Sequence, residues 1–205
     1  MDLSSPMSSV IPHSYGPVLA VLARAGRPLS GRQVAGLVDG RVGRSRVNAV
    51  LGELTASGIV LCSSHPPALL YELNREHVAA PLVVGLADLR AALFHRMRES
   101  LGEWPVPPAA LWVFGSAARG DGSVDSDIDV FVLRPDDEPA DDVWSAQLDD
   151  FSSKVGRWSG NSCSVLEMTR AELARAVGEG DRIVDELRRD ACWIAGAAPE
   201  ATLHT

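Results

Sequence analysis

The fold is decided by the stretch VFGSAARGDGSVDSDIDV, residues 113–130. Its first residues continue an apolar run that begins at Ala109, which predicts a strand over 109–114. A polar, glycine-rich excursion follows, and the chain then returns as a second predicted strand, Ile128–Leu133. The stretch therefore predicts two neighbouring strands whose connection carries polar side chains.

Two carboxylates enter the second of these strands together. Because side chains alternate between the faces of a strand, Asp127 and Asp129 point the same way, while Ile128 and Val130 point into the core. Two carboxylates on one face repel each other unless a cation lies between them. Mg²⁺ prefers carboxylate oxygen and often keeps substrate phosphate as a ligand. We therefore predict a metal site for Mg²⁺ or Mn²⁺ at Asp127 and Asp129.

The beginning of the excursion is suited to phosphate. Gly115 lets a phosphate approach the backbone closely. The Ser116 hydroxyl and the amides after it offer hydrogen bonds to phosphate oxygens. Arg119 supplies a positive charge. We predict that these three residues bind a nucleotide.

These residues together resemble the signature of the DNA polymerase β-type nucleotidyltransferase superfamily, in particular its minimal nucleotidyltransferases. The shared features are Gly115-Ser116, ten intervening residues, and Asp127-Ile128-Asp129, and the resemblance covers residues 109–170. It implies a mixed sheet flanked by helices and metal-dependent transfer of a nucleoside monophosphate from a nucleoside triphosphate, expected to be ATP. Two-metal chemistry of this kind stabilises both the attacking and the leaving oxygen.

The resemblance also implies a third catalytic acid on a neighbouring strand. Cys163–Met168 reads as that strand, and Glu167 is its only acid. Glu167 is therefore our candidate for the third catalytic residue beside Asp127 and Asp129. The alternative is a solvated glutamate close to the next helix, which the capping pattern at Thr169 predicts. In that case the site binds a nucleotide with weak or absent turnover.

The N-terminal part has a different pattern. Three short helical segments precede two short strands, at 59–62 and 69–73, and this order is typical of a winged helix. Ser30 is the expected N-cap of the second helix, and Ser45 of the third. In a helix-turn-helix unit the second helix enters the major groove by its N-terminal residues. We therefore predict that double-stranded DNA is bound by four residues: Arg41, Arg44, Arg46 and Asn48.

The charge is distributed in agreement with this division. Residues 1–75 carry seven arginines and four acids, a net charge of +3, and the remainder carries twelve bases and 23 acids, a net charge of −11. A basic head favours contact with nucleic acid there, whereas the acidic remainder disfavours a long nucleic-acid substrate.

We accordingly predict an α+β fold in which an N-terminal winged helix precedes a nucleotidyltransferase domain with a mixed β-sheet flanked by helices. The expected parts are a flexible arm (1–15), a winged helix-turn-helix domain (16–75), a connecting helix (76–104), the nucleotidyltransferase domain (105–198) and a tail (199–205). Residues 76–101 are a candidate contact for a homodimer. Within the second domain, a helix is expected over residues 181–193.

The remaining composition favours a cytoplasmic protein. The three cysteines are far apart, and no pair has metal-binding spacing. No apolar run approaches the roughly 20 residues that span a bilayer, so we expect no membrane segment.

Two functions agree with these patterns. The first is a nucleotidyltransferase that modifies a protein or a small molecule. By resemblance the partner is a toxin, because minimal relatives often act as antitoxins. The alternative is a transcriptional regulator whose second domain senses a nucleotide or a partner without catalysis.

Overall fold

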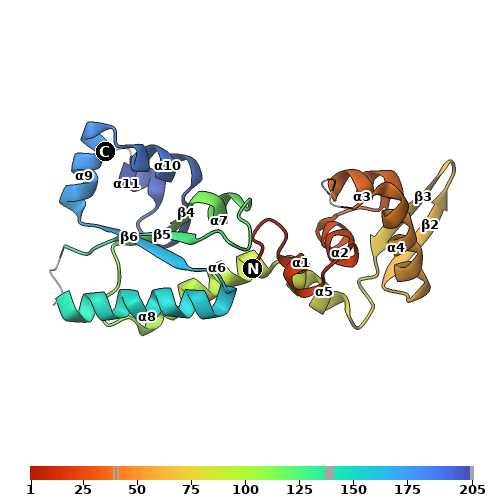
Figure 1. Ribbon diagram of the computed structural model, residues 1–205, viewed down its shortest axis with the longest axis horizontal. Coiled ribbons are helices and arrows are strands. Elements are labelled where there is room, and N and C mark those ends of the chain that lie inside the picture. Colours follow the sequence, from red (N-terminus) through yellow and green to blue (C-terminus); the bar gives the residue numbers. More distant parts are fainter. Residues whose placement is uncertain (39, 41, 137–140, 204–205) are drawn as a thin grey trace. The chain divides into compact units, whose positions relative to one another are not determined.

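The chain folds into two compact units, each with its own hydrophobic core, in a computed structural model that describes residues 1–38, 40, 42–136 and 141–203 (Figure 1). One unit is Ser5–Leu89, and the other combines Met1–Ser4 with Arg90–Thr205. We call them the head and the sheet unit. No helix in the described ranges is long and apolar enough to cross a bilayer.

The head combines helices with a small antiparallel sheet. The sheet has the strand order β1-β3-β2. The elements in chain order are α1 (Pro6–Val10), α2 (Tyr15–Arg24), β1 (Leu29–Ser30), α3 (Gly31–Leu37), α4 (Arg44–Ala56), β2 (Val60–His65), β3 (Ala68–Leu73) and α5 (Ala80–Ala87). The three helices and the hairpin expected from the sequence are present, together with the short strand β1, which the sequence pattern did not indicate.

Local sequence signals set the helix boundaries in the head. Ser30 and Gln33 form a capping box at the start of α3, as predicted for Ser30. The prediction of Ser45 as the N-cap of the third helix was wrong. This helix, α4, begins at Arg44 with Gly43 as its N-cap, so Ser45 already lies inside it. Apolar residues of α2, α3 and α4 form the centre of the core: Val18, Leu22, Val34, Val47, Val50 and Leu51.

The expected arm and connecting helix also differ from the structure. Leu3 and Met7 are buried, and residues 6–10 form α1, so the first fifteen residues are not a loose arm. The burial of two large apolar side chains stabilises this segment in a way that its Ser-rich composition conceals. The expected connecting helix is divided at Asp88 into α5 and α6 (Leu89–Ser100).

The sheet unit is built on a mixed four-stranded sheet with the order β6-β5-β4-β7. Its strands are β4 (Ala110–Phe114), β5 (Ile128–Leu133), β6 (Cys163–Met168) and β7 (Cys192–Gly196). β4 pairs antiparallel with both β5 and β7, and β5 pairs parallel with β6. This agrees with the predicted mixed sheet.

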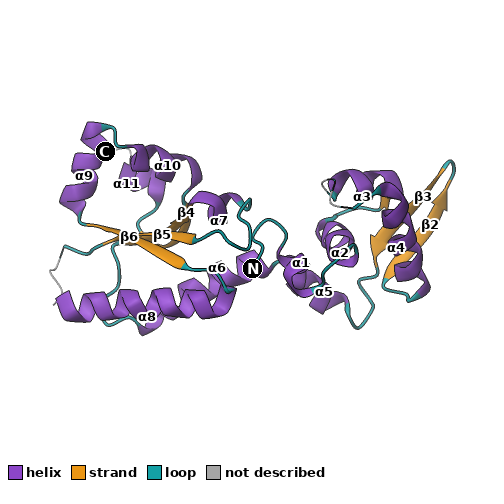
Figure 2. Ribbon diagram, in the orientation of Figure 1, coloured by secondary structure: helices purple, strands orange, loops and turns teal. Residues whose placement is uncertain are grey.

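Helices cover both faces of this sheet (Figure 2). α6 and α8 (Asp141–Ser159) pack against one face through residues such as Met97 and Phe151. α9 (Arg170–Glu179), α10 (Arg182–Asp190) and α11 (Pro199–Leu203) pack against the other. A short 3-10 turn, Leu101–Glu103, follows α6, and α7 (Gly115–Arg119) follows β4.

Two expectations about the C-terminal part were wrong. The helix expected over 181–193 ends at Asp190, and β7 takes Cys192 and Trp193. β7 is an edge strand that lays Ile194 into the core while Trp193 stays half exposed. Residues 199–203 of the expected tail instead form α11, which buries Leu203.

Candidate functional site

The stretch over residues 113–130 lies at one edge of the four-stranded sheet, at the ends of its two central strands, where β4 finishes and β5 begins. β4 ends at Phe114, which pairs with Asp129 at the start of β5. Gly115 then begins α7 with a φ of +67°, and a Cβ built on it would lie only 2.7 Å from Oδ2 of Asp129. Only glycine accepts both this backbone conformation and this approach without strain. The glycine thus brings the polypeptide backbone against a carboxylate.

The two carboxylates of the predicted metal site lie together at this edge. Asp127 is exposed and Asp129 is partly buried. Burial raises the pKa of Asp129, the negative charges of Asp127 and Glu186 raise it further, and the charge of Arg119 opposes this. A divalent cation would relieve this repulsion, and carboxylate oxygens are the ligands that hard cations prefer. The pair therefore fits the expected metal.

The third residue at this edge is a serine. Because β6 runs parallel to β5, Ser164 stands opposite Asp129. Its hydroxyl donates to Oδ2 of Asp127 at 3.4 Å. The sequence did not single out Ser164, since the pairing of β6 with β5 is what places it there.

Glu167 does not join the two aspartates, which corrects its prediction as the third acid. It stands opposite Val132, so it lies on the face that packs against α8. Its carboxylate accepts a hydrogen bond from Nε1 of Trp144 at 2.7 Å and lies 3.5 Å from Arg134. Glu167 therefore interacts with Trp144 and Arg134 and does not lie beside Asp129. Within the described ranges, no group of three His, Cys, Asp or Glu side chains is arranged to hold a metal.

The three predicted phosphate-binding residues all lie on α7, which a loop follows. The loop returns over Ser116, since a Cβ built on Gly122 would lie 3.0 Å from its hydroxyl. The Arg119 guanidinium donates to Asp121 at 3.0 Å and to Asp190 at 2.5 Å. Asp190 is a further residue at this edge that the sequence did not indicate, because it comes from α10, 71 positions away.

Cys163 precedes Ser164 on β6, packs on the α8 face, and does not offer a nucleophile. Burial above all raises the pKa of its thiol to about 11, and the charges of Asp129 and Asp127 add to this effect. At neutral pH the thiol is protonated, whereas the thiolate is the reactive form.

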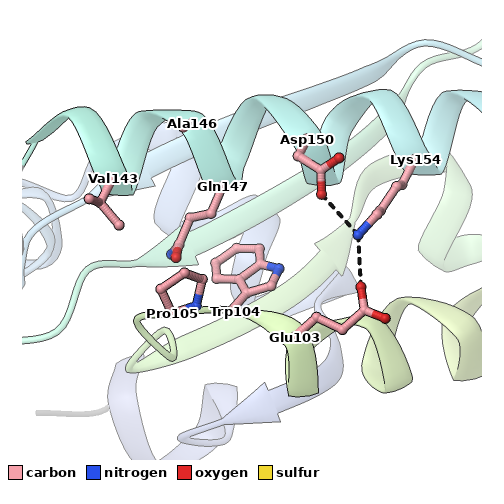
Figure 3. A pocket seen from close by; sticks show the side chains of 8 residues that line it. All are labelled: Glu103, Trp104, Pro105, Val143, Ala146, Gln147, Asp150 and Lys154. Carbon is pink, nitrogen blue, oxygen red and sulfur yellow. Dashed lines mark hydrogen bonds and ion pairs between the residues drawn. The ribbon is translucent and has the colours of Figure 1, made fainter.

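A hollow lies on the α8 side of the sheet unit, away from the two aspartates (Figure 3). Trp104 and Pro105 face α8 there, and Gln147 exchanges two hydrogen bonds with the backbone of Val106. The ammonium group of Lys154 lies 2.9 Å from a carboxylate oxygen of both Glu103 and Asp150. These polar groups satisfy one another and include neither aspartate of the candidate metal site.

Three of the four predicted DNA-contacting residues lie in the first half of α4. Arg44 is exposed there. Arg46 is half exposed, and its guanidinium donates to the Ser14 hydroxyl at 2.9 Å. Asn48 lies against Gly31, where a Cβ would meet its Oδ1 at 2.5 Å. Arg41 lies outside the described residues.

Comparison with known proteins bears on the sheet unit. A family model described as "Nucleotidyltransferase domain" matches residues 95–189. The match includes both aspartates, the Gly-Ser turn and Ser164, and it supports the nucleotidyltransferase superfamily for this part of the chain. No curated protein matches the chain, and no solved structure does.

Proposed function

We propose that the sheet unit transfers a nucleoside monophosphate from a nucleoside triphosphate, expected to be ATP, with Mg²⁺ or Mn²⁺ held by Asp127 and Asp129. The family match supports nucleotidyl transfer in general. The observation that carries the specific proposal is the contact of Gly115 with the Asp129 carboxylate, which brings the predicted phosphate-binding turn and the metal-binding pair together.

Each residue of the site has a defined task in this proposal. Gly115 and Ser116 bind phosphate oxygens, and Arg119 opposes their negative charge. Ser164 donates to Asp127 and keeps that carboxylate turned toward the edge of the sheet. When bound, the metal would stabilise negative charge on the attacking and leaving oxygens of the transferred phosphate.

The charge of the chain favours a protein or a small molecule as the acceptor. The residues after position 75 carry a net charge of −11, which repels a long nucleic acid. A partner protein, such as the toxin of an antitoxin-like pair, agrees with this charge.

Label transfer from ATP tests the proposal. The protein is incubated with α-labelled ATP and Mg²⁺, alone and with the product of the neighbouring gene. We expect transfer that is lost in Asp127→Ala and Asp129→Ala. Asp149→Ala is the matched control, because it removes the same charge from an exposed position on α8. Transfer that persists in both site variants would overturn the proposal.

Ser164 favours a second candidate function, in which the sheet unit senses a nucleotide without catalysis. A neutral hydroxyl, rather than a third carboxylate, faces Asp127 and Asp129 from β6. ATP binding that depends on Asp127, without any label transfer, would support the sensor over the enzyme.

We also propose that the head is a winged helix that binds double-stranded DNA. Its helices, its hairpin and the net charge of +3 over residues 1–75 support this. A gel shift with DNA from upstream of the gene tests the proposal with Arg44→Ala and Arg46→Ala combined. We expect weaker binding that is less sensitive to salt, since phosphate contacts release counterions. Unchanged binding would remove α4 as the recognition helix.

A further inference from the structure

A buried carboxylate holds two arginines side by side at the edge of the sheet that carries the candidate site. Asp190 is the last residue of α10, and its side chain is only 3% exposed. Arg119 donates to its Oδ2 at 2.5 Å. Arg189 donates to both of its oxygens, from Nε and from Nη2, each at 2.9 Å. The two guanidinium groups are thus fixed on one acidic anchor.

The topology places this anchor beside the candidate site. Cys192, at the start of β7, pairs with Val113 near the end of β4, so α10 ends at the edge where α7 begins. α10 also packs against α7. The charge of Arg119 acts on Asp129. Arg119 therefore acts on the candidate metal site, and Arg189 lies beside Arg119 on the shared carboxylate of Asp190.

Both arginines keep hydrogen-bond donors for a ligand. Their bonds to acids use Nε and Nη1 of Arg119, and Nε and Nη2 of Arg189. Among the described contacts, Nη2 of Arg119 and Nη1 of Arg189 have no protein partner. The two side chains are 40% and 61% exposed. Guanidinium groups bind phosphate through paired hydrogen bonds, so these donors are suited to a phosphate chain.

We propose that Arg189 is a second binding residue for the triphosphate, beside Arg119, and that Asp190 positions both. This inference rests on the proposed nucleotidyl transfer. The two arginines would repel each other without an acid between them. Asp190 offsets this repulsion and leaves the group of three residues with a net positive charge toward the phosphates. Arg119 also contacts Asp121, which is 59% exposed and free to turn into solvent when phosphate replaces it.

Titrations of the intact protein with ATP and with AMP test the role of Arg189. We expect Arg189→Gln to weaken ATP binding about tenfold or more, as the loss of a charged hydrogen bond does. AMP has no β- or γ-phosphate, so its affinity should stay the same. Arg175→Gln is the control, because it removes an equal charge from an exposed position on α9. ATP affinity in Arg189→Gln equal to that of the wild type would overturn the inference.

The positioning role of Asp190 is tested by the ratio of ATP to AMP affinity. We expect Asp190→Ala to lower this ratio and Asp190→Glu to restore part of it. A purely structural anchor would weaken both ligands equally, and that result would overturn the positioning role. Failure of the proposed nucleotidyl transfer differs from both outcomes, because the wild-type protein would then transfer no label from ATP, whether or not Arg189→Gln weakens ATP binding. A wild-type protein that binds neither ATP nor inorganic triphosphate would overturn the inference as well.

Discussion

The site requires a glycine at position 115, because a side chain there would not fit. Its positive φ and its approach to Asp129 both exclude a Cβ. We expect Gly115→Ala to lower the free energy of unfolding by about 1–3 kcal/mol, as for other non-glycine residues in this backbone region. It should also weaken ATP binding, because the added methyl displaces the carboxylate. Thermal unfolding and nucleotide titration measure the two effects.

Gly178→Ala provides the matched control for that change. Gly178 lies within α9, and a Cβ there meets nothing within 4 Å. Alanine in a helix loses less conformational entropy on folding than glycine does, so this variant should be as stable as the wild type or more so. If both variants behaved alike, the contact with Asp129 would not be the reason for the glycine.

Asp129 links the site to the pH dependence of stability. Its pKa is raised in the folded protein, first by burial and then by the charge of Asp127. The folded state therefore holds this proton at a pH where the unfolded chain has lost it, so ionisation of Asp129 opposes folding. Stability should fall as pH rises from the ordinary aspartate value through the raised one.

Asp129→Asn should therefore raise the melting temperature slightly at neutral pH in the absence of divalent ions. The gain should disappear at a pH below the ordinary aspartate pKa, where both states are protonated. Added Mg²⁺ should stabilise the wild-type protein and not the variant. A variant that Mg²⁺ stabilises as strongly as the wild type would place the metal elsewhere.

Among the secondary-structure elements, β6 decides which side chains reach the site. Its parallel register with β5 directs Ser164 toward the aspartates and Glu167 toward α8. We expect Glu167→Ala to leave the buried indole N–H of Trp144 without its acceptor, which costs about 1–3 kcal/mol of stability. Label transfer per folded molecule should stay unchanged. A large loss of transfer in a variant of unchanged stability would return Glu167 to the site.

The strands of the sheet unit could be predicted from the sequence wherever turn residues separate an apolar run from the neighbouring elements. β5 and β6 have the expected bounds, and β4 differs by one residue, because each is an apolar segment between turn residues. β7 could not be predicted in this way. Its first residues continue the helical pattern of α10, and only pairing with β4 makes them a strand.

The same distinction applies to the candidate site. The Gly-Ser turn and the two aspartates are local in sequence, so spacing and alternation were enough to bring them together. Ser164 and Asp190 reach the same edge only through the register of β6 and the packing of α10. Glu167 was misplaced for this reason, since its face depends on contacts that a single strand does not reveal.

At the scale of the whole molecule, the chain has separate cores in the head and the sheet unit. The basic and acidic halves of the sequence correspond broadly to these units. A separate core lets each unit keep its own packing when the other is altered. The first residues of the chain allow a direct test, because Leu3 belongs to the core of the sheet unit and Met7 to that of the head.

We expect Leu3→Ala and Met7→Ala to destabilise different units, although only four positions separate them. Both side chains are at most 2% exposed, and truncating a buried residue of this size costs about 2–5 kcal/mol. Hydrogen exchange should show lost protection in β4 and β5 for Leu3→Ala, and in α2 and α4 for Met7→Ala. ATP binding should weaken only in the first variant, and DNA binding only in the second. Lost protection in both units from either change would mean that the two cores unfold as one.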